Sequence, residues 1–188
     1  MRLFVAIDLD EQAQNAIADE QRRLVRALGR DGGSLRWVWP DQMHLTLVFI
    51  GNADEVRAHA IVDTMHHGLA ASPFAMVFTG VGVFPPQGAP NVLWLGVGAG
   101  AREAVDLQRA VAERLEMVGV ARERRPFHPH LTLARWRSSK PSDRRRVLAA
   151  SGDDDVARID VRVVALYRSH LSSAGPTYEV LARAPLGT

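Results

Sequence analysis

The chain of 188 residues contains no cysteine. This absence excludes disulfide bonds, thiolate metal sites, iron–sulfur clusters and a cysteine nucleophile. Long apolar runs are also missing. The longest, such as residues 45–50, have the length of a strand and fall far short of the ~20 residues that span a bilayer. Any catalysis must therefore come from histidine, carboxylates, hydroxyls, arginine or a hard metal.

The amino end offers no targeting signal, because the sequence reaches an acidic residue, Asp8, too early for the apolar core of a signal peptide. The composition, 47% apolar and 23% charged, is that of a folded globular protein and not of a disordered chain. We therefore expect one bilobal domain over residues 1–188, monomeric, cytoplasmic and without membrane contact.

Lysine is nearly absent, since Lys140 is the only one among 23 basic residues and the others are arginines. The formal net charge is only +2, yet residues 114–146 carry nine arginines and Lys140 against three acidic residues, a local balance of +7. The rest of the chain therefore sums to −5. Such a basic zone indicates an anionic ligand such as phosphate or RNA; a solvated helix face explains it equally well.

Hydrophobic periodicity and turn residues divide the chain into alternating strands and helices. We expect strands over residues 2–9, 35–38, 43–50, 74–83, 91–97, 127–136, 158–171 and 177–184. We expect helices over residues 11–29, 53–70, 101–118 and 141–150. Asp10 is the predicted cap of the first helix, and Gly29 its end.

One tetrapeptide occurs twice, as His-Leu-Thr-Leu at residues 44–47 and again at 130–133. Each copy follows a predicted strand and helix, residues 2–29 before the first and 91–118 before the second. The same four residues at the same place in two matching units indicate two similar halves of the protein.

The repeated motif places a polar pair on one strand face, because residues i and i+2 of a strand point the same way. His44 therefore shares a face with Thr46, and His130 shares one with Thr132. The intervening leucines face the core. If the halves are related by an approximate two-fold axis, both polar faces can line one cleft.

Two facing imidazoles suit acid–base chemistry near neutral pH, since one can accept a proton while the other donates one. Threonine hydroxyls beside them can donate hydrogen bonds to phosphate oxygens. Arg135, three residues beyond Thr132, can add a guanidinium group to the same phosphate. The sequence therefore favours in-line displacement at phosphorus.

A metal site is the competing interpretation of these histidines. His128 shares a face with His130, so a His-x-His ligand pair is possible, but neither motif has a second histidine at i+4 or a nearby carboxylate. We therefore expect no metal. Four aromatic residues can either stack a nucleobase or pack in the core, and the core is the more common outcome; they are Phe4, Trp37, Trp39 and Phe84.

At these residues the sequence resembles the two-histidine phosphoesterases, whose signature is a pair of H-x-T-x motifs. Further segments are similar to the bacterial and archaeal RNA 2′,3′-cyclic phosphodiesterases, also called the 2′-5′ RNA ligase family. These segments are residues 2–8, 36–38, 92–96, 125–135 and 175–181. The similarity runs nearly from end to end.

The resemblance implies an α+β fold of two pseudo-symmetric lobes, each an antiparallel sheet with helices on its outside, and an active-site cleft between them. It implies hydrolysis of an RNA 2′,3′-cyclic phosphate to a 2′-phosphate without metal or other cofactor. His44 then matches the proton donor and His130 the acceptor. Thr46 and Thr132 match the phosphate-binding threonines, and Arg135 matches an arginine that contacts the phosphate.

Three other functions fit the same residues. The first is hydrolysis of small cyclic phosphates. The second is 2′-5′ ligation by the reverse reaction, which needs no nucleotide cofactor because the cyclic phosphate stores the strain. The third is a module that binds RNA 3′ ends without turnover. The histidine pair argues against this last function, since binding a phosphate needs no base.

Overall fold

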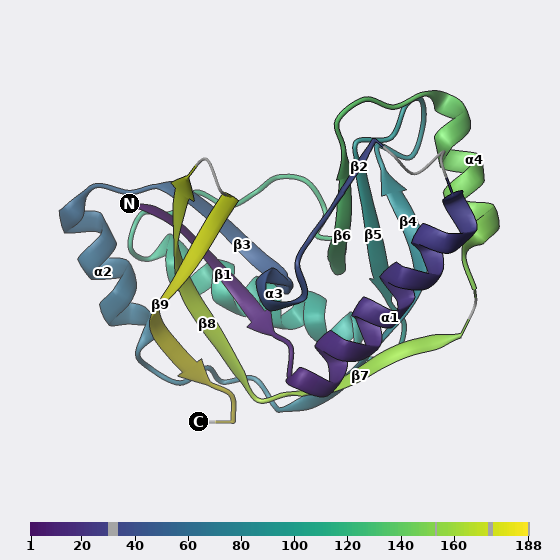
Figure 1. Ribbon diagram of the computed structural model, residues 1–188. Coiled ribbons are helices and arrows are strands. Elements are labelled where there is room, and N and C mark those ends of the chain that lie inside the picture. The colour runs from purple at the N-terminus through teal and green to yellow at the C-terminus, as the bar shows by residue number, and fades with distance from the viewer. Residues whose placement is uncertain (30–33, 153, 173–174, 188) are drawn as a thin grey trace.

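The computed structural model describes residues 1–29, 34–152, 154–172 and 175–187. Two antiparallel sheets form two lobes that stand side by side, with helices around them (Figure 1). This arrangement confirms the predicted α+β fold. No helix within the described ranges is both long and apolar enough to cross a membrane.

The sheet of the first lobe has the strand order β3-β1-β8-β9. Its strands are β1 (Arg2–Asp8), β3 (His44–Asn52), β8 (Val163–Ser172) and β9 (Gly175–Pro185). The sheet of the second lobe has the order β2-β6-β5-β4-β7. Its strands are β2 (Leu35–Trp37), β4 (Phe74–Phe84), β5 (Val92–Val97), β6 (His130–Trp136) and β7 (Asp155–Val161).

The α-helices are α1 (Glu11–Leu28), α2 (Glu55–Met65), α3 (Ala101–Glu116) and α4 (Pro141–Ala150), and η2 (Pro40–Gln42) is a short 3-10 helix. The predicted ends of α1 are confirmed. The Asp10 side chain accepts a 2.8 Å hydrogen bond from the amide of Ala13, and Gly29 ends the helix with a φ of 52°. Glycine adopts this positive φ at little cost, whereas other residues are strained there.

Two helices cross from one lobe to the other. Helix α1 follows β1 of the first sheet but packs against β7 of the second, and α3 follows β5 of the second sheet but packs against β3 of the first (Figure 1). Helix α1 buries one apolar stripe that includes Ile17 and Leu24, as its helical spacing predicts. Each lobe therefore owes part of its core to a helix from the other half of the sequence.

The predicted internal repeat is confirmed by the pairing of the strands. In the first lobe His44 lies opposite Asp8, and in the second His130 lies opposite Gly96. Both pairings contain a β-bulge at the same place in the motif, where the register skips Leu47 on β3 and Leu133 on β6. The two motifs thus match in their strand pairing, including this irregularity.

The predicted strand over residues 158–171 is wrong, because the chain forms two strands that belong to different sheets. Strand β7 pairs with β4 in the second lobe, and β8 pairs with β1 and β9 in the first. The chain passes between the lobes at Arg162, which is exposed. Apolar residues on both sides of this crossing made the segment look continuous.

The predicted helix over residues 53–70 is too long at both ends. Helix α2 starts after Asp54, whose side chain accepts a 2.8 Å hydrogen bond from the amide of Arg57. It ends at Met65, and Leu69 instead forms a bridge with Leu186 beside β9. A tertiary contact therefore replaces the last predicted turn.

Candidate active site

The structure brings the five predicted site residues together. His44, Thr46, His130, Thr132 and Arg135 line one cavity of about 720 Å³ between the lobes. The leucines between them are buried, with exposed fractions of 0 to 3% for Leu45, Leu47, Leu131 and Leu133. The alternation of core and cavity residues that the motif predicts is thus present in both strands.

The β-bulge explains why Arg135 lies in this cavity. Regular alternation would point a residue three positions beyond Thr132 to the opposite face. The bulge at Leu133 places Leu133 and Ala134 consecutively in the core and returns Arg135 to the face of Thr132. On β5, Val92 lies opposite Arg135 and Trp94 lies opposite Thr132. Because Val92 and Trp94 share one face of their strand, Arg135 and Thr132 also share one face of theirs.

The bulge of the second lobe is held by helix α1. Gln21, the only polar side chain that is buried among the described residues, donates hydrogen bonds to the carbonyls of Leu133 (3.1 Å) and Val38 (3.0 Å). The amide of Val38 also donates to Leu133 (2.9 Å). The Leu133 carbonyl therefore accepts hydrogen bonds both from α1 and from the segment that follows β2, which stabilises the strand where Arg135 changes face.

The ring of His44 is packed among aromatic side chains of the first lobe. It stacks on Phe4 with ring centroids 4.7 Å apart and meets the edge of Tyr178 at 5.1 Å. Burial lowers the pKa of His44, while a hydrogen bond to the backbone of Gln42 and the negative charge of Asp8 raise it. The ring is therefore oriented by aromatic packing and lies opposite Asp8 on the neighbouring strand.

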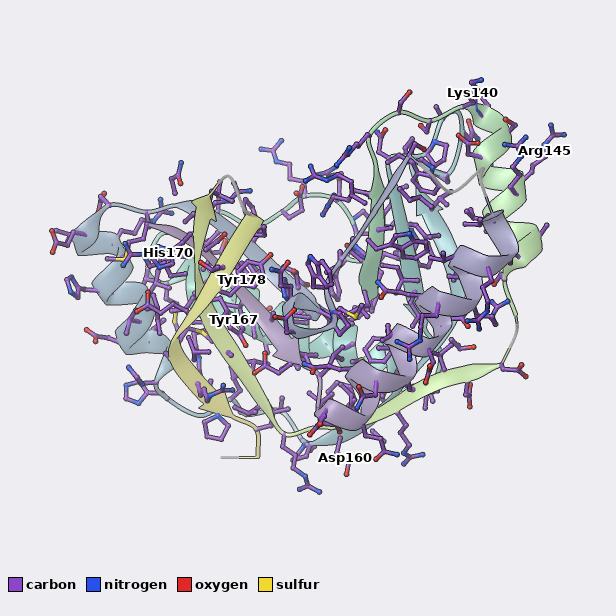
Figure 2. All side chains as sticks on the ribbon, viewed as in Figure 1. Lys140, Arg145, Asp160, Tyr167, His170 and Tyr178 are labelled. Carbon is purple, nitrogen blue, oxygen red and sulfur yellow. The ribbon has the colours of Figure 1, made fainter. Side chains whose placement is uncertain are left out.

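Asp8 connects His44 to a polar network on the first sheet. The carboxylate accepts hydrogen bonds from the Tyr167 hydroxyl and from Arg183 Nη1, the latter at 2.9 Å. Burial and this bond raise the pKa of Tyr167 far above its ordinary value, so the phenol stays a donor at physiological pH. Tyr167 and Tyr178 project from β8 and β9 of the first lobe (Figure 2).

The ring of His130 is held in a comparable way by the second lobe. Its Nδ1 lies 2.7 Å from the backbone carbonyl of His128, which makes Nδ1 the donor and leaves Nε2 for a ligand. The edge of the ring meets Phe84, with centroids 5.0 Å apart. Burial lowers the pKa of His130, the His128 carbonyl raises it, and the electrostatic influence of the His128 side chain and of Arg135 lowers it further.

Trp94 packs against the rings of His128 and His130. Its ring lies 6.1 Å from that of His130 and 4.9 Å from that of His128, and its Nε1 is buried without a hydrogen-bond partner among the described residues. The indole lies over Gly82 on the neighbouring strand, so closely that a Cβ at residue 82 would overlap the ring. Glycine at this position therefore allows Trp94 to pack beneath the histidines.

Substituting Gly82 tests this packing. In Gly82→Ala the new methyl group must displace Trp94 and, with it, the ring of His130. We expect kcat/KM to fall by about 10- to 100-fold, the cost of misplacing a catalytic group by about 1 Å. Gly152→Ala is the matched control, since nothing lies closer than 3.9 Å to its Cβ. A folded Gly82→Ala protein with unchanged activity would contradict the role of Trp94.

The described residues contain no group of three or more histidine, aspartate or glutamate side chains positioned to hold a metal ion. The rings of His128 and His130 do not converge on one point, because they are stacked, with centroids 6.4 Å apart and an interplanar angle of 25°. His170 lies outside the cavity and pairs with Glu179 at 3.0 Å. The other histidines thus contribute no metal site to the cavity.

The basic zone of residues 114–146 does not form one surface. Arg135 and Arg137 line the cavity of the histidines, whereas Arg145 lies on α4, on the outside of the second lobe (Figure 2). Arg122 and Arg125 line a second cavity of about 930 Å³ that meets the first at Thr46 and His130. A charge balance along the sequence therefore overestimates the positive charge at the site.

Sequence reasoning missed several residues around the histidines. Asp8 and Tyr167 stand on strands whose pairing is not visible in the sequence. Phe49 was detectable, because it occupies in the first repeat the position that Arg135 holds in the second, and it lies 59% exposed on the rim of the second cavity. The two halves of the site thus differ chemically at this pair of positions.

Two similar lobes that bring a pair of His–Thr motifs to one cavity define the two-histidine phosphoesterases. The model of the 2′-5′ RNA ligase superfamily matches residues 8–172, which include both motifs. The chain belongs to this superfamily.

Known proteins resemble the chain over almost its whole length. An RNA 2′,3′-cyclic phosphodiesterase of Archaeoglobus fulgidus is 31% identical over 181 residues, covering 96% of this chain and 98% of that protein. A protein of the same name from Thermus thermophilus is 32% identical over 189 residues, covering 97% and 89%.

Solved structures share the same fold. A crystal structure of a protein from Thermus thermophilus superimposes with a TM-score of 0.79 at 29% identity, covering 98% of this chain and 97% of that one. E. coli LigT in complex with 3′-AMP gives a TM-score of 0.76 at 24% identity, covering 100% and 98%. The two-lobed architecture is thus common to these proteins.

Proposed function

We propose that this chain hydrolyses the 2′,3′-cyclic phosphate at the end of an RNA to a 2′-phosphomonoester, by paired histidine catalysis that needs no metal. The observation that carries the proposal is the cavity lined by both His–Thr pairs and by Arg135. The relatives named RNA 2′,3′-cyclic phosphodiesterase support the choice of substrate.

The mechanism follows from what each side chain can do. Water attacks phosphorus while losing a proton to His130, the bond from phosphorus to the 3′ oxygen breaks, and His44 gives its proton to that oxygen. The product keeps its phosphate on the 2′ oxygen. Thr46 and Thr132 donate hydrogen bonds to the non-bridging oxygens. The guanidinium group of Arg135 balances their charge.

The charges around each histidine support this division of roles. A general acid must hold its proton, and Asp8 raises the pKa of His44 against the effect of burial. A histidine that acts as general base must be deprotonated, and Arg135 adds to the effect of burial in lowering the pKa of His130. The two similar halves therefore provide unlike environments for the two proton transfers.

The deciding experiment is an assay of the purified protein on a single-stranded oligonucleotide that ends in a 2′,3′-cyclic phosphate, with EDTA present throughout. We expect turnover to persist and the product to be a 2′-phosphate, identified by phosphorus NMR of the digest. Turnover that is lost in EDTA and restored by zinc or manganese would replace this mechanism with metal-assisted hydrolysis. A 3′-phosphate product would contradict the assigned leaving group.

The pH dependence of kcat/KM should be a bell on the acidic side of the ordinary histidine pKa of 6.5, because burial lowers the pKa of both His44 and His130. The acidic limb reports loss of the base as His130 is protonated. The alkaline limb reports loss of the acid as His44 is deprotonated. A bell centred well above pH 6.5 would contradict this assignment.

The Asp8→Asn variant tests which histidine is the acid. Asp8 raises the pKa of His44, so its neutralisation lowers that pKa and moves the alkaline limb to lower pH. Tyr167→Phe keeps the carboxylate and separates the effect of charge from that of the hydrogen bond. Asp63→Asn on the exposed face of α2 is the control. If the alkaline limb does not move in Asp8→Asn, the group that causes this limb is not His44.

A further inference from the structure

We propose that the cavity of the histidines continues into a groove that binds the single-stranded RNA leading to the cyclic end. The groove is formed by Trp39, Arg36 and Arg137, which line the same cavity as Arg135. This inference rests on the proposed function and deepens it, because it makes an oligonucleotide the preferred substrate over a free cyclic nucleotide.

The first observation is a cluster of arginines without carboxylate partners. Arg36 on β2 lies directly opposite Arg135 on β6, and Arg137 follows two residues later. All three are exposed, and within the part of the chain that the structure describes no carboxylate pairs with any of them. Like charges that face each other across two strands destabilise a sheet. Phosphate groups bound between them would remove this repulsion.

The second observation is an exposed indole on the same wall. Trp39 is 70% exposed, whereas Trp37 and Trp136 nearby pack partly against the core. Its backbone is fixed, since its carbonyl accepts a 2.9 Å hydrogen bond from the amide of Gln42 in η2. The ring therefore stands on a rigid turn just beyond the end of β2 and offers its face to a ligand.

The opposite wall of the cavity comes from the first lobe and is also apolar. Leu171 on β8, 66% exposed, lines the same cavity as Trp39. The two walls are connected, because the Gln42 side chain donates a 3.2 Å hydrogen bond to the Pro176 carbonyl on β9. The groove thus has apolar side chains on both walls and arginines beside them.

This combination of groups fits single-stranded RNA. An aromatic face stacks a nucleobase that is free of a partner strand, and neighbouring arginines bind the phosphates on either side of it. The reacting phosphate occupies the His–Thr cavity, so the groove receives the nucleotide next to the cyclic end. A free cyclic nucleotide has no such neighbour and cannot use the groove.

The test compares two substrates under identical conditions: 2′,3′-cyclic AMP and a single-stranded dodecanucleotide with a 2′,3′-cyclic end. We expect a higher kcat/KM for the dodecanucleotide, falling as salt rises because bound phosphates release counterions. The ratio to follow is kcat/KM for the dodecanucleotide divided by kcat/KM for 2′,3′-cyclic AMP. Trp39→Ala should lower this ratio about tenfold or more, and Trp39→Phe should keep most of the preference for the dodecanucleotide. Arg137→Gln should lower the ratio and flatten its salt dependence.

Two controls make the comparison specific. Arg145→Gln on the outer face of α4 removes the same charge outside the groove and should leave the ratio unchanged (Figure 2). Annealing the dodecanucleotide to its complement, with a blunt cyclic end, should abolish its advantage. Duplex RNA that reacts as fast as the single strand would overturn the proposed stacking.

Binding provides a second readout that does not depend on turnover. Fluorescence anisotropy of a labelled dodecanucleotide ending in a 2′-phosphate should show about tenfold weaker binding to Trp39→Ala than to the unmodified protein. The groove is refuted if Trp39→Ala binds this probe normally, or if it slows both substrates equally. If the probe binds through Trp39 and neither substrate is hydrolysed, the groove stands and the proposed hydrolysis fails.

Discussion

Replacing His44 or His130 by alanine should lower kcat by roughly 10²- to 10⁴-fold, the usual contribution of a positioned acid or base. Each ring stands in the cavity in a fixed orientation: His44 is packed between Phe4 and Tyr178, and His130 is hydrogen-bonded to the His128 carbonyl. The loss should appear with 2′,3′-cyclic AMP as well as with RNA, since both substrates carry the reacting phosphate.

The double variant should be far less impaired than the product of the two single effects, because the histidines act as one unit in a single displacement. His59→Ala on the exposed face of α2 is the control for loss of an imidazole. Steady-state kinetics of the unmodified protein, the two single variants, the double variant and the control decide the matter. A double variant whose defect equals the product of the single defects would show that the two groups act independently.

The second large effect is expected at Arg135. Arg135→Ala should reduce kcat/KM by about 10²- to 10³-fold both on 2′,3′-cyclic AMP and on RNA with a 2′,3′-cyclic end, because it removes a charged donor to the phosphate undergoing reaction. Arg135→Lys should restore only part of the activity, since an ammonium group keeps the charge without the planar pair of donors. Arg145→Ala should behave like the unmodified protein.

Arg135 also has a signature in the pH profile. Its charge lowers the pKa of His130, so Arg135→Ala should raise that pKa and move the acidic limb of the bell to higher pH. The alkaline limb should stay in place. Full activity of Arg135→Ala on 2′,3′-cyclic AMP would show that Arg135 does not contact the reacting phosphate. Among the five predicted residues, only Thr46 and Thr132 would then bind its oxygens.

The α+β fold class follows from the resemblance to a family, whereas the residue pattern alone suffices to predict the repeat and the convergence of the two motifs. The latter two depend on local alternation or on a repeat, and Leu45 and Leu131 are buried as the alternation requires. Arg135 is predicted from its place near Thr132 in the basic zone and from the resemblance to a family, but not from the strand geometry. Simple alternation places Arg135 in the core, and the bulge that reverses its direction has no signal in the residues themselves.

The features that could not be predicted depend on contacts between distant parts of the chain. The crossing at Arg162 lies within an apolar stretch that reads as one strand. Asp8 meets Tyr167 and Arg183 only because β1 pairs with β8 and β8 with β9. Gln21 contacts Leu133 across 112 positions of sequence. No local pattern distinguishes such residues from others of their type.

The exchange of helices between the lobes has a consequence for the motion of the cleft. Helix α1 is attached covalently to β1 of one lobe and by packing and Gln21 to the other, and α3 makes the reciprocal connection. A hinge that opened the lobes would have to detach both helices from the sheets they cover, exposing apolar surface at each. We therefore expect the gap between the histidines to be set during folding and to change little when RNA arrives or leaves. The catalytic groups would then be preorganised before the substrate binds, and catalysis would not require the lobes to close around it.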